Sequence, residues 1–228
     1  PNHMAGVPSH WYTIITSAKM QSQDLSNLIS AAVGGDAMDV TLEEQVNNFL
    51  ESHNCKYQLT KGYGMTEVNG SIGRTVDRKS PIGSVGIPFC KSCVSIFDIE
   101  TGEELSYNQI GEICMTGPNM MMGYFDKPDA TAEIKRMHND GQYWIHSGDV
   151  GYMNKDDNLF VVNRIKRLII RFDGFKIFPS MIETVLQKSS AIKTCSVVGI
   201  KDKDHNQGKL PIVYAVLNGG NKADVVKK

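Results

Sequence analysis

Residues 57–67 read YQLTKGYGMTE, a short apolar run that leads into a loop containing glycine. The run Tyr57–Thr60 predicts a strand, and Gly64 would let the backbone after it come close to a ligand, because glycine has no Cβ. Tyr63 could offer its ring to a base, a contact worth about 1–3 kcal/mol where it has been measured. The stretch favours a nucleotide site at the end of a strand in an α/β fold.

The last two residues of this stretch have side-chain oxygens that could interact with a phosphate or a metal ion. Thr66 can donate a hydrogen bond to a phosphate oxygen, and Glu67 is a hard oxygen ligand of the kind that Mg²⁺ prefers. The alternative is a glycine turn with a half-buried tyrosine and a solvated glutamate. The combination of ring, hydroxyl and carboxylate makes the nucleotide interpretation the favoured one.

A second segment, WIHSGD at residues 144–149, adds another carboxylate. Asp149 follows Ser147 and Gly148, so we expect its carboxylate to project from a tight turn. The two hydroxyls of a ribose can both donate to one carboxylate. Taken alone, an aspartate that bonds its own backbone is the commoner explanation. Asp149 becomes a candidate ribose ligand only in combination with the first segment.

The residues before the first segment alternate between strand and helix patterns. Ala31–Val33 predicts a buried strand that ends in a turn at Gly34 and Gly35. A helix is expected to open at Thr41, with Glu44 as its partner in a capping box. This alternation is typical of an α/β layer.

Three parts follow from the change of pattern along the chain. Residues 1–75 predict the remainder of an α/β layer, and residues 76–163 predict a compact β-rich subdomain, a mostly antiparallel sheet or β-barrel-like structure. One helix, capped by Asp129, is expected to cover Ala130–Met137 in this second part. Residues 164–228 show a β-α-β-β order, which predicts the start of a small α+β domain. The fold class expected is therefore α/β with α+β.

Composition excludes several classes of protein. The 228 residues carry a formal net charge of −1, which gives no general attraction to nucleic acid. No stretch approaches the roughly 18 consecutive apolar residues of a transmembrane helix. Five cysteines with a single C-x-x-C, Cys90 to Cys93, favour reduced thiols over a zinc or redox motif. We expect a cytoplasmic protein.

Several segments, taken in order, resemble the carboxyl-terminal half of the adenylate-forming superfamily, in particular the acyl-CoA synthetases. The resemblance covers nearly the whole chain, and ordered motifs at family spacing are more specific than any one of them. The segments are Gly34–Ala37 (glycine turn), Tyr63–Glu67 (Y-G-x-T-E), Gly111–Tyr124 (G-E…G…G-Y), Trp144–Asp149 (W-x-x-T-G-D, with Ser147 for threonine) and Arg164–Glu183 (hinge and P-x-x-I-E helix).

The resemblance implies a role for each residue of the first segment and of the glycine turn. Gly34 and Gly35 would lie beside the adenine, on which Tyr63 would stack. Thr66 would contact the phosphate and Glu67 would bind Mg²⁺. Thr66 and Glu67 would thus count among the catalytic residues.

The resemblance also assigns the later segments. Asp149 would hold the ribose hydroxyls, and Arg164 would act as a third catalytic residue at ribose or phosphate. Lys166 would lie where the small domain pivots between two poses. Gly174 and Phe175 would border the pantetheine tunnel in the second pose.

The reaction implied is the activation of a carboxylic acid by ATP to acyl-AMP, followed by transfer to a thiol. Gly64 and Met65 would lie near the acyl group. The cofactors implied are ATP or AMP, Mg²⁺ and coenzyme A, and the substrate would be a fatty or aryl acid, as in fatty acid metabolism. A homodimer is possible, and no nucleic-acid partner is expected.

Two sequence features of the family are missing from this chain. The Ser/Thr/Gly-rich phosphate loop and the terminal lysine of the family have no counterpart here, so we expect a fragment of a larger ligase that is inactive alone. Asn163 stands where the family carries glycine before Arg164. Two alternatives stay open: a non-catalytic adenylate-binding or interaction module, and an adenylation domain that serves a carrier protein.

Overall fold

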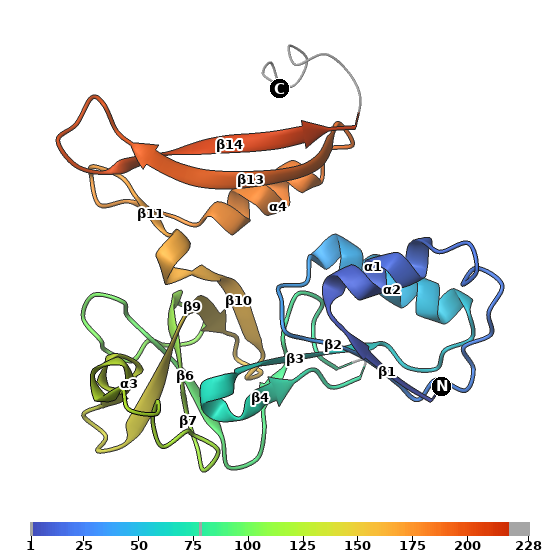
Figure 1. Ribbon diagram of the computed structural model, residues 1–228, viewed down its shortest axis with the longest axis horizontal. Coiled ribbons are helices and arrows are strands. Elements are labelled where there is room, and N and C mark those ends of the chain that lie inside the picture. Colours follow the sequence, from blue (N-terminus) through green and yellow to red (C-terminus); the bar gives the residue numbers. More distant parts are fainter. Residues whose placement is uncertain (1, 78, 219–228) are drawn as a thin grey trace. The chain divides into compact units, whose positions relative to one another are not determined.

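The computed structural model describes residues 2–77 and 79–218 (Figure 1). They form two compact units. The first comprises the residues up to Ser147 together with Gly151–Val161, and the second comprises Gly148–Val150 together with the residues from Val162 onward. The mixed α/β fold class predicted from the sequence is confirmed.

The first sheet of the first unit has five strands. The first three strands in space run parallel, and the last two pair antiparallel with their neighbours. In spatial order the strands are β1 (His3–Gly6), β2 (Ser30–Val33), β3 (Leu59–Met65), β4 (Gly70–Arg74) and β5 (Ile87–Pro88). Strand β3 begins two residues later than the strand predicted at Tyr57–Thr60 and continues through Tyr63, which the sequence had placed in a loop.

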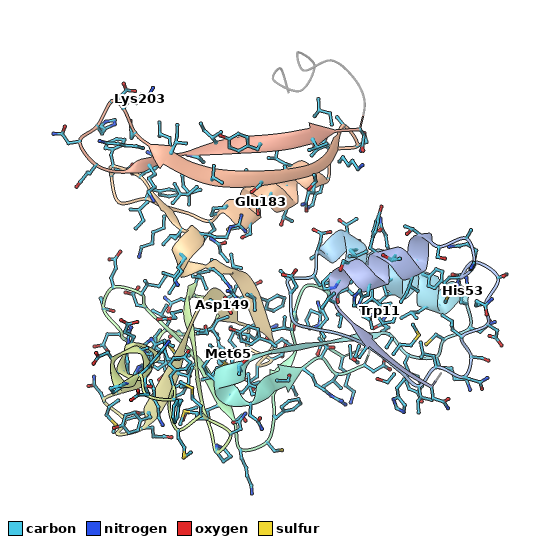
Figure 2. The ribbon with its side chains drawn as sticks, in the orientation of Figure 1. Trp11, His53, Met65, Asp149, Glu183 and Lys203 are labelled. Atoms are coloured by element: carbon cyan, nitrogen blue, oxygen red, sulfur yellow. The ribbon has the colours of Figure 1, made fainter. Side chains whose placement is uncertain are left out.

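Two helices, α1 (Pro8–Thr16) and α2 (Val40–Ser52), cover one face of the parallel strands (Figure 1). Pro8 begins α1, a position where its missing N–H costs nothing. Trp11 lies between α1 and the sheet (Figure 2), is almost completely buried, and donates from Nε1 to the carbonyl of Ala32 at 2.9 Å. Burial of such side chains holds both helices on the sheet.

The cap of α2 differs from the prediction. Asp39, not Thr41, is the N-cap, and its Oδ1 accepts from the amides of Thr41 at 2.8 Å and Leu42 at 3.2 Å. The helix begins at Val40, so Thr41 already lies inside the first turn. A short carboxylate at the preceding residue reaches the free amides directly, which is why the capping box was wrong.

The second sheet has the strand order β10-β9-β7-β6, with β8 paired to β9, and this path does not close into a barrel within the described residues. The predicted helix at 130–137 is shorter: α3 covers Pro128–Ile134 with Lys127 as N-cap, because Pro128 takes the first helical position. The strands are β6 (Cys93–Phe97), β7 (Gly111–Thr116), β8 (Lys135–Met137), β9 (Tyr143–Met153) and β10 (Leu159–Arg164).

A hydrophobic core joins the two sheets of the first unit. It collects side chains from β4 of the first sheet, from the turn Thr66–Val68 and from four strands of the second sheet. Each fully buried aliphatic residue contributes about 1.5–3 kcal/mol. Its buried members are Val68, Ile72, Val94, Ile96, Ile113, Met115, Ile145 and Leu159.

The second unit pairs a long hairpin with one helix. Strands β13 (Ile192–Lys201) and β14 (Lys209–Leu217) run antiparallel, and α4 (Pro179–Gln187) packs against β13 (Figure 1). A shorter hairpin, β11 (Ile169–Ile170) with β12 (Lys176–Ile177), precedes the helix. No helix within residues 2–77 and 79–218 combines the length and apolar composition that a membrane span requires.

Candidate functional site

A glycine-lined edge forms where the three parallel strands end. The Gly34 amide donates to the Gly6 carbonyl at 3.2 Å, and a Cβ on Gly34 would lie 3.6 Å from the carbonyl oxygen of Gly62. Gly35 follows with φ +80°, a conformation that glycine adopts without strain. In open α/β sheets this carboxyl edge is where ligands bind, so Gly34 and Gly35 lie at the expected place.

Strand β3 leaves the regular ladder at Tyr63 and Gly64. The pairing with β4 shifts between these two residues, and a Cβ on Gly64 would lie only 1.8 Å from the carbonyl oxygen of Gly70. Gly64 is therefore required by the close approach of two backbones. Tyr63 is half-buried and packs against the core cluster, while Met65 ends the strand (Figure 2).

Thr66 and Glu67 lie in a single 3₁₀ turn, η1 (Thr66–Val68), directly after β3. Thr66 is exposed. Tyr124 donates from its hydroxyl to Oε1 of Glu67 at 2.5 Å, and the Met121 amide donates to the Glu67 carbonyl at 2.8 Å. Two contacts from one loop thus fix both the backbone and the carboxylate of Glu67.

The bond to Glu67 changes the phenol as well. It raises the pKa of Tyr124 to about 12, since the neutral phenol is the form that donates. Among the described residues, no hydrogen bond reaches the second carboxylate oxygen of Glu67. One carboxylate oxygen together with phosphate oxygens is a usual environment for Mg²⁺, so Glu67 fits the ion that the sequence implied.

Asp149 and Arg164 belong to the second unit and are bonded to each other. Nε of Arg164 lies 2.9 Å from Oδ1 of Asp149, whose side chain is 13% exposed against 74% for Arg164. The expected turn is not present, because Asp149 lies within β9 and pairing extends that strand to Met153. Gly148, with φ +70°, interrupts the regular strand geometry just before it.

The basic stretch after Arg164 divides into different environments. Lys166 is exposed in the turn η2 (Ile165–Arg167). Arg167 donates to Oε1 of Glu183 at 2.6 Å, and the same oxygen accepts from the Val197 amide at 2.7 Å. Glu183, on α4 (Figure 2), thereby ties η2 to β13, a partner that the sequence did not predict.

Gly174 and Phe175 lie in the turn of the β11–β12 hairpin. Gly174 has φ +81° and lines a cavity of about 390 Å³ that also contains Arg171 and Lys209. Phe175 is exposed, and the guanidinium carbon of Arg171 lies 5.5 Å from the centre of its ring. The cavity combines these two cations with the ring of Phe172 and apolar surface, while Phe175 lies outside its lining.

The structure brings the predicted residues together in two groups. Gly34, Gly35 and Tyr63–Glu67 lie in the first unit, and Asp149 and Arg164 form a pair in the second. Sequence reasoning missed Tyr124 as a partner of Glu67, although the motif that contains it was noticed.

Comparison with known proteins identifies the family. Residues 1–125, more than half of the chain, match the family described as AMP-binding enzyme. The chain belongs to the AMP-binding enzyme family. The resemblance to adenylate-forming enzymes is thus confirmed, and the matched residues include the whole Y-G-x-T-E segment.

Individual relatives agree with this family. Luciferin 4-monooxygenase of Photinus pyralis is 33% identical over 216 residues, which is 94% of this chain and 37% of that relative. 4-Coumarate–CoA ligase 1 of Glycine max is 34% identical over 219 residues, 94% of this chain and 71% of that relative. The chain therefore spans well under half the length of the luciferase.

A solved structure shows the same fold. O-succinylbenzoate coenzyme A synthetase (MenE) from Bacillus subtilis, in complex with ATP and a magnesium ion, matches with a TM-score of 0.78 and 25% identity. The match covers 99% of this chain and 44% of that one.

Proposed function

We propose that this AMP-binding family member is part of an ATP-dependent acid–thiol ligase, which activates a fatty or aryl carboxylic acid as acyl-AMP and transfers it to coenzyme A. The observation that supports this most is the Glu67 carboxylate, held by Tyr124 beside the exposed Thr66 at the carboxyl end of β3. The acid–CoA ligases among the relatives support the reaction class.

The first unit would bind the base and phosphates. Tyr63 would stack on adenine, with Gly34 and Gly35 beside it. Thr66 would donate to the α-phosphate while Glu67 holds Mg²⁺, which would offset negative charge as pyrophosphate leaves. The acid attacks the α-phosphorus through a carboxylate oxygen, so the bond to pyrophosphate breaks as the acyl-AMP bond forms.

The second unit would bind the ribose. Asp149 would accept from the two hydroxyls, and Arg164 would turn to a ribose or phosphate oxygen. Because the Arg164 side chain is 74% exposed, it can turn away from Asp149 into solvent when the nucleotide binds. Lys166 would act at the pivot between the two reaction poses.

The thiol would approach along the β11–β12 turn. We place Gly174 and Phe175 at the border of the pantetheine path, with Gly64 and Met65 near the acyl group. The cations Arg171 and Lys209 around the adjoining cavity suit the phosphates of coenzyme A. The thiol then attacks the acyl carbonyl and AMP leaves.

Several coarser expectations belong to the same proposal. We propose that residues 1–75 and 76–163 are subdomains of the large domain, and that residues 164–228 are part of a mobile carboxyl-terminal domain. A homodimer and a cytoplasmic location stay predictions. We also propose that this chain alone does not turn over.

Nucleotide binding by the chain itself tests the proposal. Isothermal titration with AMP, with and without Mg²⁺, should show binding that Tyr63→Ala and Asp149→Asn each weaken about tenfold or more. Glu67→Gln should remove the effect of Mg²⁺. Glu133→Gln, an exposed carboxylate on α3, is the matched control and should bind as the unmodified chain does. If all three site variants bind AMP and respond to Mg²⁺ as the unmodified chain does, the assignment is wrong.

The reaction needs a separate test. Pyrophosphate exchange into ATP should be measured for the chain alone and for the longer protein that contains it, with a panel of fatty and aryl acids. We expect exchange by the longer protein only. Exchange without thioester formation from coenzyme A would favour a carrier-protein acceptor, and no exchange with any acid would favour a binding module.

A further inference from the structure

A second group of reactive side chains lies outside the proposed nucleotide site. Glu112 and Cys114 are two residues apart on β7 and so share one face of the strand, and His146 faces them from the neighbouring β9. One ligand atom from each, a carboxylate oxygen, Sγ and an imidazole nitrogen, lies within 4.8 Å of the others. Strand pairing thus brings three metal-binding groups to one point.

We propose that Glu112, Cys114 and His146 form a binding site for a divalent transition metal of the zinc type. One thiolate, one imidazole and one carboxylate suit zinc, which keeps a fourth position for water when only three protein ligands are present. Binding releases the proton of the Cys114 thiol to solvent. The nucleotide site does not use any of these residues.

The distances fit such a site. Nδ1 of His146 lies 3.5 Å from Sγ of Cys114. In a tetrahedral site with Zn–N of about 2.0–2.1 Å and Zn–S of about 2.3 Å, these two atoms would lie about 3.5 Å apart. Oε2 of Glu112 is 2.8 Å from the same nitrogen, so it would move by about half an ångström to let the ion in.

An outer residue is already in place to orient the imidazole. Nε2 of His146 lies 2.9 Å from Nε2 of His138. An imidazole that binds metal through Nδ1 carries its proton on Nε2 and donates it to such a partner, an arrangement that most metal-binding histidines have. His138 would therefore be a positioning residue for the site.

Aromatic rings shield the group from bulk water. Phe97 packs edge-on against His138 at 4.4 Å and against Trp144 at 5.3 Å between ring centres. Cys114 is fully buried with Phe97 and Trp144, whereas the Glu112 side chain keeps 13% of its surface exposed. The ion would enter past Glu112 to a buried position, where electrostatic interactions are stronger than in water.

The competing interpretation is a hydrogen-bond network without metal. In that network His146 donates from Nδ1 to Glu112 and accepts at Nε2 from His138. Metal binding reverses both assignments, because Nδ1 must then carry the lone pair that binds the ion. The two interpretations therefore predict opposite imidazole tautomers.

Cobalt titration of the full chain tests the site. The exposed thiols Cys90 and Cys93 are first replaced by serine, since they could bind cobalt themselves. We expect one Co²⁺ per chain, a thiolate-to-cobalt charge-transfer band, and loss of that band when Zn²⁺ is added. Cys114→Ser should abolish the band, while the matched control Cys195→Ser should keep it.

Two further measurements keep the proposal open to refutation. His138→Gln should weaken metal affinity by about 10–100-fold without removing the thiolate band, as expected of a residue that orients a ligand. If Cys114→Ser does not fold, ¹H–¹⁵N NMR of the unmodified histidines decides, and Zn²⁺ should move the His146 proton to Nε2. Any of three results would overturn the site. The first is that cobalt gives no charge-transfer band while Cys114 is still present. The second is a band that remains in Cys114→Ser, and the third is a His146 tautomer that Zn²⁺ does not change.

Discussion

Glu67 is the residue on which the proposed adenylation chemistry depends most, and its orientation is set by a side chain far away in sequence. The Tyr124 hydroxyl donates to Oε1, so Oε2 is the oxygen that could bind an ion. A carboxylate with one fixed oxygen loses less freedom when it binds an ion than one that rotates freely. Tyr124 should therefore matter for metal-dependent binding although it need not touch the nucleotide.

Removal of the Tyr124 hydroxyl tests this role. We expect Tyr124→Phe to weaken the Mg²⁺-dependent part of AMP binding three- to tenfold, which corresponds to about 0.7–1.4 kcal/mol. Isothermal titration over a series of Mg²⁺ concentrations measures the effect. Tyr12→Phe, at an exposed tyrosine of α1, is the control. An unchanged Mg²⁺ dependence would show that Glu67 does not need the phenol.

The same bond predicts an unusual alkaline titration. The pKa of Tyr124 is raised to about 12, against about 10 for a free tyrosine. Because the folded-state pKa is the higher one, the stability that this bond adds is fully present below about pH 10 and is lost as the pH rises toward 12. Ultraviolet difference titration of the unmodified chain against Tyr124→Phe should show one tyrosine ionising near pH 12. In Glu67→Gln that ionisation should move back toward 10.

Some contacts at this scale could be predicted from the sequence and others could not. Tyr63, Gly64 and Glu67 stand in one short segment, so their common location was readable. The contact between His146 and His138 could not be predicted, because the pairing of β8 with β9 sets it. The bond between Asp149 and Arg164 likewise depends on strand pairing and not on spacing.

At the scale of elements, the start of α2 shows how local chemistry sets a boundary. Asp39 satisfies two amides that the helix leaves free, whereas the Thr41 side chain lies within the first turn. We expect Asp39→Ala to lower the free energy of unfolding by about 0.5–2 kcal/mol and Thr41→Ala to change it much less. Urea denaturation of both variants provides the comparison. If Thr41→Ala lowers the free energy of unfolding more than Asp39→Ala does, the capping box at Thr41 would be the better description.

Helix α2 is also joined to β3 by a buried ion pair. Glu43 bonds Nζ of Lys61 and accepts from the Gly83 amide at 3.0 Å, and both charged side chains are almost fully buried. Burial lowers the pKa of Lys61, and the Glu43 carboxylate acts against that shift. The pair therefore fixes the position of α2 on the sheet at a cost in desolvation.

Single and double changes should behave differently at this pair. Glu43→Gln leaves a buried ammonium without its counter-charge and should cost about 3–5 kcal/mol. Glu43→Leu combined with Lys61→Met removes both charges and should be close to neutral or stabilising. Urea denaturation of the three proteins measures the contrast. Equal losses in the single and double variants would mean that packing, not charge, dominates there.

For elements, local signals located helices and strands but not their caps, and strand pairing could not be predicted. Ala31–Val33 was correctly placed as a strand before its glycines. The predicted turn at Asp149 was wrong, because β9 pairs with its neighbours through that point. Pairing partners lie too far apart in sequence for a short window to contain them.

At the scale of the whole molecule, each unit buries apolar side chains of its own. Val68 is fully buried in the first unit and Val197 almost fully in the second. We expect calorimetry to show two unfolding transitions, since a chain with two compact units need not unfold in one step. Val68→Ala and Val197→Ala should each lower a different transition, by about 2 kcal/mol. One transition that both variants shift equally would contradict this.

The chain crosses the boundary between the two units more than once. Gly148–Val150 belongs to the second unit, although the residues just before and after it in β9 belong to the first. A gene segment that starts at Val162 would therefore encode Arg164 but leave its acidic partner Asp149 behind on another polypeptide. Expression of the residues from Val162 onward on their own would lose this ion pair. A graft of these residues onto a related protein would keep an equivalent pair only if the recipient supplies its own counterpart of this part of β9.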